Sequence, residues 1–319
     1  MKVAVDRRGV GQRLDRFLAD TLAKTRDGLS RAEVQRWIDA GRVTIAGAAA
    51  RGKDILREGT VIDVQPMEPA RTELVPDASV PMTILHVDDA VVVLVKPPGV
   101  AVHPAPGSEH RTLVHGLLAR GLFESEATVP DDADARTRPG IVHRLDKGTS
   151  GVMVVARTAQ AREALKAQFS AHTIDREYVA LCLGVAATAT HRTLHGRDPR
   201  NRLRFTSRVR SGKSAVTHVL CMEELAGGAA CLVRCTLETG RTHQIRMHLA
   251  ESGTPVLGDP VYGRRSRDAR VERVQRSLGH QALHARLLGF EHPTTHARVR
   301  FEAPPPPDFA AALDELRGS

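Results

Sequence analysis

Hydrophobic and polar residues in the first 65 positions follow the pattern of a small folded module. In GQRLDRFLADTLA, the apolar residues recur at helical spacing and predict an amphipathic helix; they are Leu14, Phe17, Leu18 and Leu22. A second helix is predicted for SRAEVQRWIDAG, because Ser30 and Glu33 have the spacing of a capping box and Gly41 is a natural C-terminal stop. The alternating runs RVTIAG and GTVIDV predict short strands.

A proline-rich segment follows this module. QPMEPARTELVPDASVP contains Pro66, Pro69, Pro76 and Pro81, and so many prolines in one short span cannot continue a helix or a sheet. We therefore predict a stiff, extended linker. The resulting organisation is an N-terminal domain at 1–65, a linker at 66–80 and a large domain at 81–319.

The large domain contains more predicted strands than helices. AVVVLVK and Val152–Ala156 read as buried strands, and four further runs read as strands bounded by turns: REYVALCLG, SAVTHVLCMEE, AACLVRCTLETG and ALHARLLGFEHP. Helices are predicted for TAQAREALKAQFSA and DFAAALDELR, and a polar loop for ESEATVPDDADARTRPG. Because strands and helices do not alternate, we expect an α+β fold with a mixed, largely antiparallel sheet.

The chain is basic, which favours a polyanionic binding partner such as nucleic acid. Its net charge is +9, and RNRLRFTSRVRSGK carries its cations without an acidic residue: Arg200, Arg202, Arg204, Arg208, Arg210 and Lys213. We interpret this segment as an arm that follows RNA phosphates; the alternative is a solvated hairpin. Aromatic residues make up only 3% of the chain, so recognition should rest on backbone shape and charge.

Further arginines lie on the polar faces of the helices predicted near the N-terminus and just after them. They are Arg13, Arg16, Arg31, Arg36 and Arg42. Such residues usually serve solubility, but their clustering here makes phosphate contact a reasonable expectation, with Arg31 as one candidate.

Several classes of function are disfavoured. The N-terminus is charged where a signal peptide needs an apolar core, and no apolar run is long enough to span a membrane, so we expect a cytoplasmic protein. The chain has no phosphate-binding loop of the GxxxxGK[ST] type, and the histidines of THQIRMH are five residues apart, so we expect neither a nucleotide cofactor nor a metal. The four cysteines are expected to be buried, reduced thiols.

The stretch GIVHRLDKGTSGVMVVART holds the candidate chemistry. Its one carboxylate, Asp146, lies between Arg144 and Lys147, and in an extended chain Arg144 and Asp146 point to the same side. A neighbouring cation favours the ionised carboxylate by about 1–3 pKa units, which suits a nucleophile or a base. Gly148 and Gly151 would allow a tight turn and the approach of a ligand. The alternative is an ion pair that only fixes a loop.

HRLDKGTSGVMVVART resembles the signature of the RluA-type pseudouridine synthases. Other segments resemble that family in the same order, from about Ile84 to the C-terminus: VLVKPPGVAVHP, REYVALCLG, GKSAVTHV, ETGRTHQIRMHLA, GTPVLGDPVYG and QALHARLLGFEHP. The first module resembles the α-L RNA-binding domain. The resemblance implies conversion of uridine to pseudouridine in structured RNA, most often large-subunit (23S) ribosomal RNA. Transfer RNA as substrate, a binding-only ribosome assembly factor, and an RNA glycosidase or lyase are the alternatives.

The resemblance also implies roles for particular residues. Asp146 would be the catalytic carboxylate, Tyr178 would pack on the flipped base, and Arg246 would pair with the aspartate. Arg144 would enter the space that the extruded base leaves, with Arg241 and His243 among the RNA contacts. No cofactor is implied because the reaction is an isomerisation, and a monomer that binds ribosomal RNA or a pre-ribosomal particle is expected.

Overall fold

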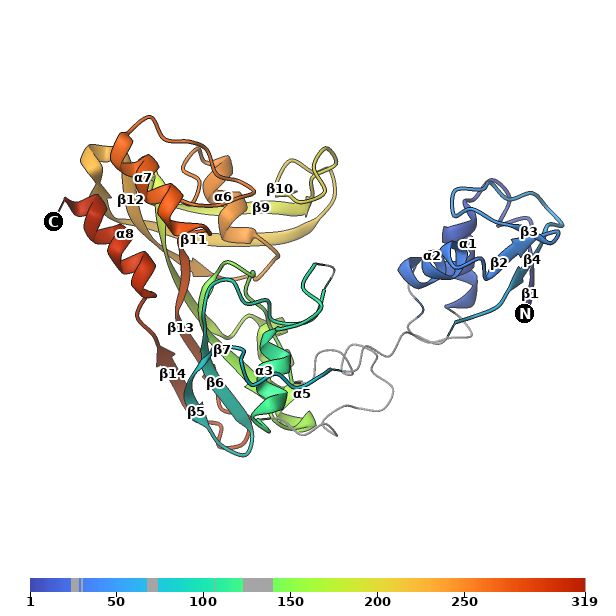
Figure 1. The fold of residues 1–319 in the computed structure, drawn as a ribbon, viewed down its shortest axis with the longest axis horizontal. Helices are drawn as coiled ribbons and strands as arrows, with labels where there is room; N and C mark the ends of the chain where they lie inside the picture. The colour runs from blue at the N-terminus through green and yellow to red at the C-terminus, as the bar shows by residue number, and fades with distance from the viewer. Residues whose placement is uncertain (24–28, 30, 68–73, 106, 123–139, 319) are drawn as a thin grey trace. The chain divides into compact units, whose positions relative to one another are not determined.

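The computed structural model describes residues 1–319 except 24–28, 30, 68–73, 106, 123–139 and 319 (Figure 1). Two compact units divide the chain, Met1–Glu73 and Leu74–Ser319. Ser30 of the predicted capping box, part of the predicted linker and nearly all of the predicted polar loop lie outside the described residues. Within the described ranges, no helix is long and apolar enough to cross a membrane.

The first unit contains both predicted helices, α1 (Leu14–Leu22) and α2 (Arg31–Asp39). They accompany an antiparallel sheet in the order β1 (Lys2–Ala4), β4 (Val61–Val64), β2 (Val43–Ile45) and β3 (Ala48–Ala49). The predicted helical stripe is buried, together with apolar side chains of α2 and of the sheet. This unit therefore has a hydrophobic core of its own.

A large mixed sheet forms the second unit. Its strands are β5 (Thr83–Val87), β6 (Val91–Lys96), β7 (Ser150–Ala156), β8 (Asp175–Leu183), β9 (Ala189–Arg197), β10 (Phe205–Thr206), β11 (Lys213–Leu225), β12 (Ala230–Leu237), β13 (Leu283–Glu291) and β14 (Arg298–Glu302). The main path runs β10-β9-β11-β12-β8-β13-β7-β6-β5, and β14 pairs with β13. Among the described pairs, only β13 and β7 run parallel, which confirms the predicted α+β class.

The helices of this unit are α3 (Leu113–Ala119), α5 (Ala159–Ala171), α6 (Gln244–Glu251), α7 (Ala269–Leu278) and α8 (Pro307–Arg317), with a short 3₁₀ turn at Ala226–Gly228. Strand β6 is buried on both faces. Val91 and Val93 belong to the same core as Leu165 of α5, while Val92 and Leu94 belong to the same core as Leu117 of α3. Burial on both faces explains why β6 is a continuous apolar run without alternation.

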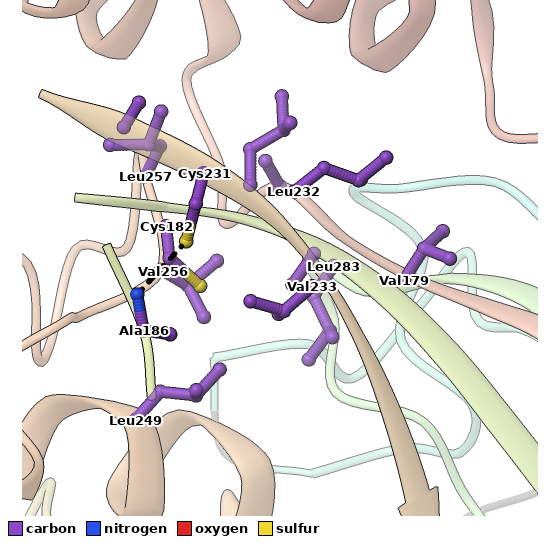
Figure 2. Close-up of a cluster of buried hydrophobic side chains, with 14 of the residues drawn as sticks. Val179, Cys182, Ala186, Cys231, Leu232, Val233, Leu249, Val256, Leu257 and Leu283 are labelled. Atoms are coloured by element: carbon purple, nitrogen blue, oxygen red, sulfur yellow. Dashed lines mark hydrogen bonds between the residues drawn. The ribbon is translucent and has the colours of Figure 1, made fainter. Parts of the chain in front are cut away.

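The other half of the sheet carries a larger core, and α7 and α8 pack against each other beside it. Figure 2 shows part of this core, including Cys182 and Cys231 from the neighbouring strands β8 and β12. The backbone amide of Ala186 donates to the sulfur of Cys231 at 3.3 Å (Figure 2). All four cysteines are free thiols, and three are buried as predicted, whereas Cys221 on β11 is only half-buried.

Candidate active site

Asp146 lies in the loop that leads into β7. The preceding residue, Leu145, is buried among apolar side chains of β6, β7 and α3. Its neighbours Arg144 and Asp146 line a cavity of about 330 Å³, to which Leu145 also contributes. That the side chains of Arg144 and Asp146 lie on one side of the loop stays a prediction.

Lys96 holds the turn after Asp146 in place. Its ammonium donates to the carbonyl oxygens of Pro97 and Val100 at 2.8 Å and of Lys147 at 3.2 Å. Burial lowers the pKa of Lys96 to about 7, and the negative charge of Asp146 opposes that change. Lys96 thus connects the end of β6 to the loop that carries the carboxylate.

Gly148 and Gly151 are needed for packing within the protein, and the expected approach of a ligand beside them stays a prediction. A Cβ at Gly148 would lie 2.4 Å from the side-chain oxygen of Gln281. Gly151 has φ +127°, and a Cβ there would lie 2.3 Å from the carbonyl oxygen of Ala285 on β13. These glycines allow β7 and the neighbouring chain to approach each other closely.

Arg246 on α6 forms the central contact of the site. Its Nη1 donates to Asp146 at 2.8 Å, so the ion pair implied by the resemblance is present. Its Nε and Nη2 donate to the two carboxylate oxygens of Asp259 at 2.7 and 2.8 Å. Asp259 therefore fixes the guanidinium in one orientation and leaves the remaining nitrogen for Asp146.

Burial and charge act in opposite directions on this network. Burial lowers the pKa of Arg246, but the hydrogen bond and charge of Asp259 and the charge of Asp146 outweigh it and raise the pKa above its usual value. Burial raises the pKa of Asp259, but the contacts with Arg246 outweigh it and lower the pKa overall. The arrangement holds one cation between two carboxylates that come from separate loops.

Tyr178 on β8 and His243 at the start of α6 line the same cavity. Burial raises the pKa of the Tyr178 hydroxyl, with Arg176 opposing this change and Asp146 adding to it. His243 has a left-handed backbone (φ 59°), and its Nε2 lies 3.8 Å from Asp146. Burial lowers the pKa of His243, which favours a neutral ring near pH 7.

The histidines of THQIRMH have different surroundings. His243 faces Asp146, whereas His248 is buried and its Nδ1 lies 2.8 Å from the hydroxyl of Thr217. Across the described residues, no group of three histidine, cysteine, aspartate or glutamate side chains is arranged to hold a metal ion.

Two of the predicted RNA contacts also line the cavity, Arg144 and Arg241. Arg241 donates from Nε to the carbonyl of Ser214 at 3.1 Å. Neither arginine forms an ion pair with a carboxylate in the described part of the chain. The rim of the cavity is therefore cationic around Asp146.

The arginine-rich segment forms β10, the turns on either side of it and the first residue of β11, Lys213. Arg204 is occupied, since its Nε donates to the carbonyl of Val261 at 2.8 Å and its guanidinium lies 5.4 Å from the ring of Tyr262. The others are exposed and form no ion pair with a described carboxylate: Arg200, Arg202, Arg208, Arg210 and Lys213. Their role in RNA binding stays a prediction.

Arg31 in the first unit has a structural partner. Its Nη2 donates to Asp15 at 2.7 Å, and Nη2 of Arg13 donates to the same oxygen at 2.9 Å. Burial raises the pKa of Asp15, but the two arginines outweigh it and lower the pKa overall. Because two cations share one carboxylate, positive charge remains at this end of α2, and phosphate contact by Arg31 stays a prediction.

The residues that sequence reasoning missed are Asp259, Lys96 and Tyr262, whose ring lies 5.4 Å from the guanidinium of Arg246. Asp259 and Tyr262 lie in the segment GTPVLGDPVYG, and Lys96 lies in VLVKPPGVAVHP. Both segments carry the family resemblance, but the pattern of neither points to a role in the site. The only sequence signal for Asp259 is an isolated acidic residue after a glycine. Its partner, Arg246, lies on α6.

Comparison with known proteins identifies the family. The family model described as RNA pseudouridylate synthase matches residues 90–251. The chain is 40% identical over 314 residues to "Ribosomal large subunit pseudouridine synthase D" of Xanthomonas campestris pv. campestris, covering 96% of this chain and 89% of that protein. It is 39% identical to "Uncharacterized RNA pseudouridine synthase YlyB" of Bacillus subtilis, covering 96% of this chain and 94% of that protein.

Solved structures agree as well. "Human RNA Pseudouridylate Synthase Domain Containing 1" superposes with a TM-score of 0.55 at 25% identity, covering 77% of this chain and 90% of the human chain. The sheet order, the paired Asp146 and Arg246, and the extent of the matches lead to one assignment. The chain belongs to the RNA pseudouridylate synthase family.

Proposed function

We propose that this synthase modifies uridines of large-subunit ribosomal RNA and that Asp146 is its catalytic carboxylate. The reaction breaks the N1–C1′ bond of uridine and joins C5 to C1′, while the C5 proton is replaced by one on N1. No atom is gained or lost overall. The substrate is inferred from relatives named as large-subunit ribosomal synthases.

One observation carries the assignment of the chemistry. Asp146 is the carboxylate that lines the 330 Å³ cavity, and Arg246 contacts it at 2.8 Å from a position that Asp259 fixes. A carboxylate held by a pre-oriented guanidinium does not need to reorganise when it reacts. Asp146 acts at the sugar, either as a nucleophile or as the base that takes a sugar proton.

The other cavity residues fit the handling of a flipped base. Tyr178 offers an aromatic ring beside Asp146, and its raised pKa keeps the hydroxyl protonated at neutral pH. Arg144 is exposed at the rim, where it can replace the extruded base in the RNA stack. We further propose that the enzyme acts as a monomer in the cytoplasm.

The substrate assignment can be tested directly. The protein is incubated with uridine-labelled large-subunit ribosomal RNA and, in parallel, with transfer RNA, and pseudouridine is mapped by its carbodiimide adducts. We expect pseudouridine at discrete positions in the ribosomal RNA. Modification of transfer RNA alone would overturn the substrate, and binding without pseudouridine in either RNA would indicate an assembly factor.

A truncated protein that begins at Leu74 tests the role of the first unit. This unit has its own core, and the described residues that line the cavity lie between Val142 and Leu283, so the remainder should fold and retain its single-turnover rate at saturating enzyme. We expect weaker binding to intact ribosomal RNA, because two tethered contacts bind more tightly than one. The logarithm of affinity falls linearly with the logarithm of salt concentration. Removing the first unit should make this slope shallower by about 0.7–0.9 for every RNA phosphate that the unit neutralises.

The measurement is the affinity of full-length and truncated protein at several salt concentrations. Equal affinities with equal slopes would show that the first unit is not an RNA contact. Normal binding with a collapsed single-turnover rate would instead show that it helps to build the active site.

A further inference from the structure

Arg176 is a buried cation in the active-site cavity to which the reaction assigns no role. On β8, Arg176 and Tyr178 share one face of the strand, and both line the cavity. The intervening Glu177 points to the opposite face, where Arg286 contacts it at 2.6 Å. Arg176 is only 7% exposed.

The contacts of Arg176 leave its charge uncompensated. Nη2 donates to the carbonyl oxygen of Glu238 at 2.8 Å, and the guanidinium lies 5.8 Å from the ring of Phe169. Its Nε is buried without a hydrogen-bond partner. In the described part of the chain no carboxylate forms an ion pair with it, whereas Arg246, equally buried, contacts two.

The surroundings of Arg176 are built to hold the guanidinium at this place. A Cβ at Gly240 would lie 2.5 Å from Nη1, so a side chain at position 240 would displace it. Arg144 and Arg241 line the same cavity and add positive charge. Burial lowers the pKa of Arg176, but an arginine stays protonated in a protein. The buried positive charge therefore reduces the stability of the fold.

A buried cation without an anion destabilises a protein, and a bound anion would offset this cost. A planar guanidinium with free N–H donors suits the oxygens of a phosphate. A uracil carbonyl could accept a hydrogen bond but could not neutralise the charge. We infer that Arg176 binds a backbone phosphate of the nucleotide whose base enters the cavity, an inference that rests on the proposed RNA substrate.

This arrangement would give the cavity two separate anchors. Tyr178 contacts the base, and Arg176, two residues earlier on the same strand face, contacts the phosphate of the same nucleotide. The sugar between them is thereby placed at Asp146. Arg176 is in this sense a positioning residue for the sugar and a direct ligand of the phosphate.

The test uses uridine 3′,5′-bisphosphate and uridine as probes, with dissociation constants measured by isothermal titration calorimetry on full-length protein. For the wild type we expect tighter binding of the bisphosphate. Arg176→Gln should weaken bisphosphate binding about tenfold or more and leave uridine binding unchanged, as for loss of a charged hydrogen-bond pair. The matched control is Arg298→Gln, which removes a neighbouring arginine that contacts Asp175 at 2.6 Å and does not line the cavity.

Thermal unfolding of each variant verifies folding. Should Arg176→Gln be unfolded, Arg176→Lys carries the test, because it keeps the charge but loses the planar fork, and bisphosphate affinity should then fall about threefold or more. Equal affinity of the wild type for uridine and its bisphosphate, or unchanged bisphosphate binding in the Arg176 variants, would overturn the inference. If the protein binds the bisphosphate through Arg176 but does not modify ribosomal RNA, the inference about Arg176 stands and the proposed ribosomal RNA substrate is wrong.

Discussion

Replacing Asp146 with asparagine should abolish pseudouridine formation while leaving folding and RNA affinity nearly unchanged. Asparagine has the size of aspartate but neither attacks a sugar nor removes a proton from it. Arg246 does not become an orphan in this variant, because Asp259 still accepts two hydrogen bonds from it. The loss should therefore appear in the chemical step.

The measurement is single-turnover conversion on an RNA that the wild type modifies, with affinity and thermal unfolding measured alongside. Asp175→Asn is a suitable control, since Asp175 forms a surface ion pair with Arg298 and does not line the cavity. Residual turnover within about tenfold of the wild type, or about 1.4 kcal/mol of barrier, would rule out the assignment of Asp146.

Replacing Arg246 with methionine should have the second large effect, on both activity and stability. Its side chain is 4% exposed, and that of Asp259 is 0% exposed. Removing the cation leaves a buried carboxylate without a partner, which costs about 3–5 kcal/mol of folding free energy. Asp146 also loses the group that orients it, so turnover should fall strongly.

The loss of stability in Arg246→Met should depend on pH in a defined direction. In the wild type the pKa of Asp259 is lowered, so its contribution to stability is present above the pKa of the unfolded chain and is lost as the pH falls. In the variant, burial without Arg246 should raise that pKa, so that protonation relieves the penalty at low pH. The difference in unfolding free energy between the two proteins should therefore be smaller at pH 5 than at pH 8.

A double variant separates folding from catalysis. Arg246→Met combined with Asp259→Asn removes the unpaired buried charge, so stability should recover relative to the single variant while turnover stays low. Recovery of turnover together with stability would show that Arg246 acts only on the fold. Unchanged stability in the single variant would contradict the buried ion-pair network itself.

Elements with a strong local pattern could be predicted from the sequence. The stripe of Leu14, Phe17, Leu18 and Leu22 defines α1, and the apolar runs of β6 and β7 are buried on both faces. Strand β9 was not predicted, because ATHRTLHGR is largely polar and its strand character comes from pairing with β11 and β10. Tertiary context overrides a weak local pattern in such segments.

In the candidate site, too, some features could be predicted from a local pattern and others depend on tertiary contacts. Asp146 and Arg144 could be selected as candidates because the basic segment around them holds a single carboxylate, and both line the cavity. The contact between Asp259 and Arg246 depends on how the loop after α6 returns beside that helix, which no local pattern encodes. Arg176 likewise has no ion-pair partner in its own strand because Glu177 faces the opposite side of β8, where it contacts Arg286. The sequence alone does not show this.

The position of β13 has a consequence for how the protein comes to be made. This strand lies between β7 and β8 and ends at Glu291, although these two neighbours are encoded more than 100 residues earlier. During synthesis the first unit can fold early as an independent domain. The catalytic sheet cannot form completely until β13 has been translated, and pairing over such long sequence separations is slow. A nascent chain would thus complete the unit proposed to hold RNA well before it acquires the ability to modify a uridine.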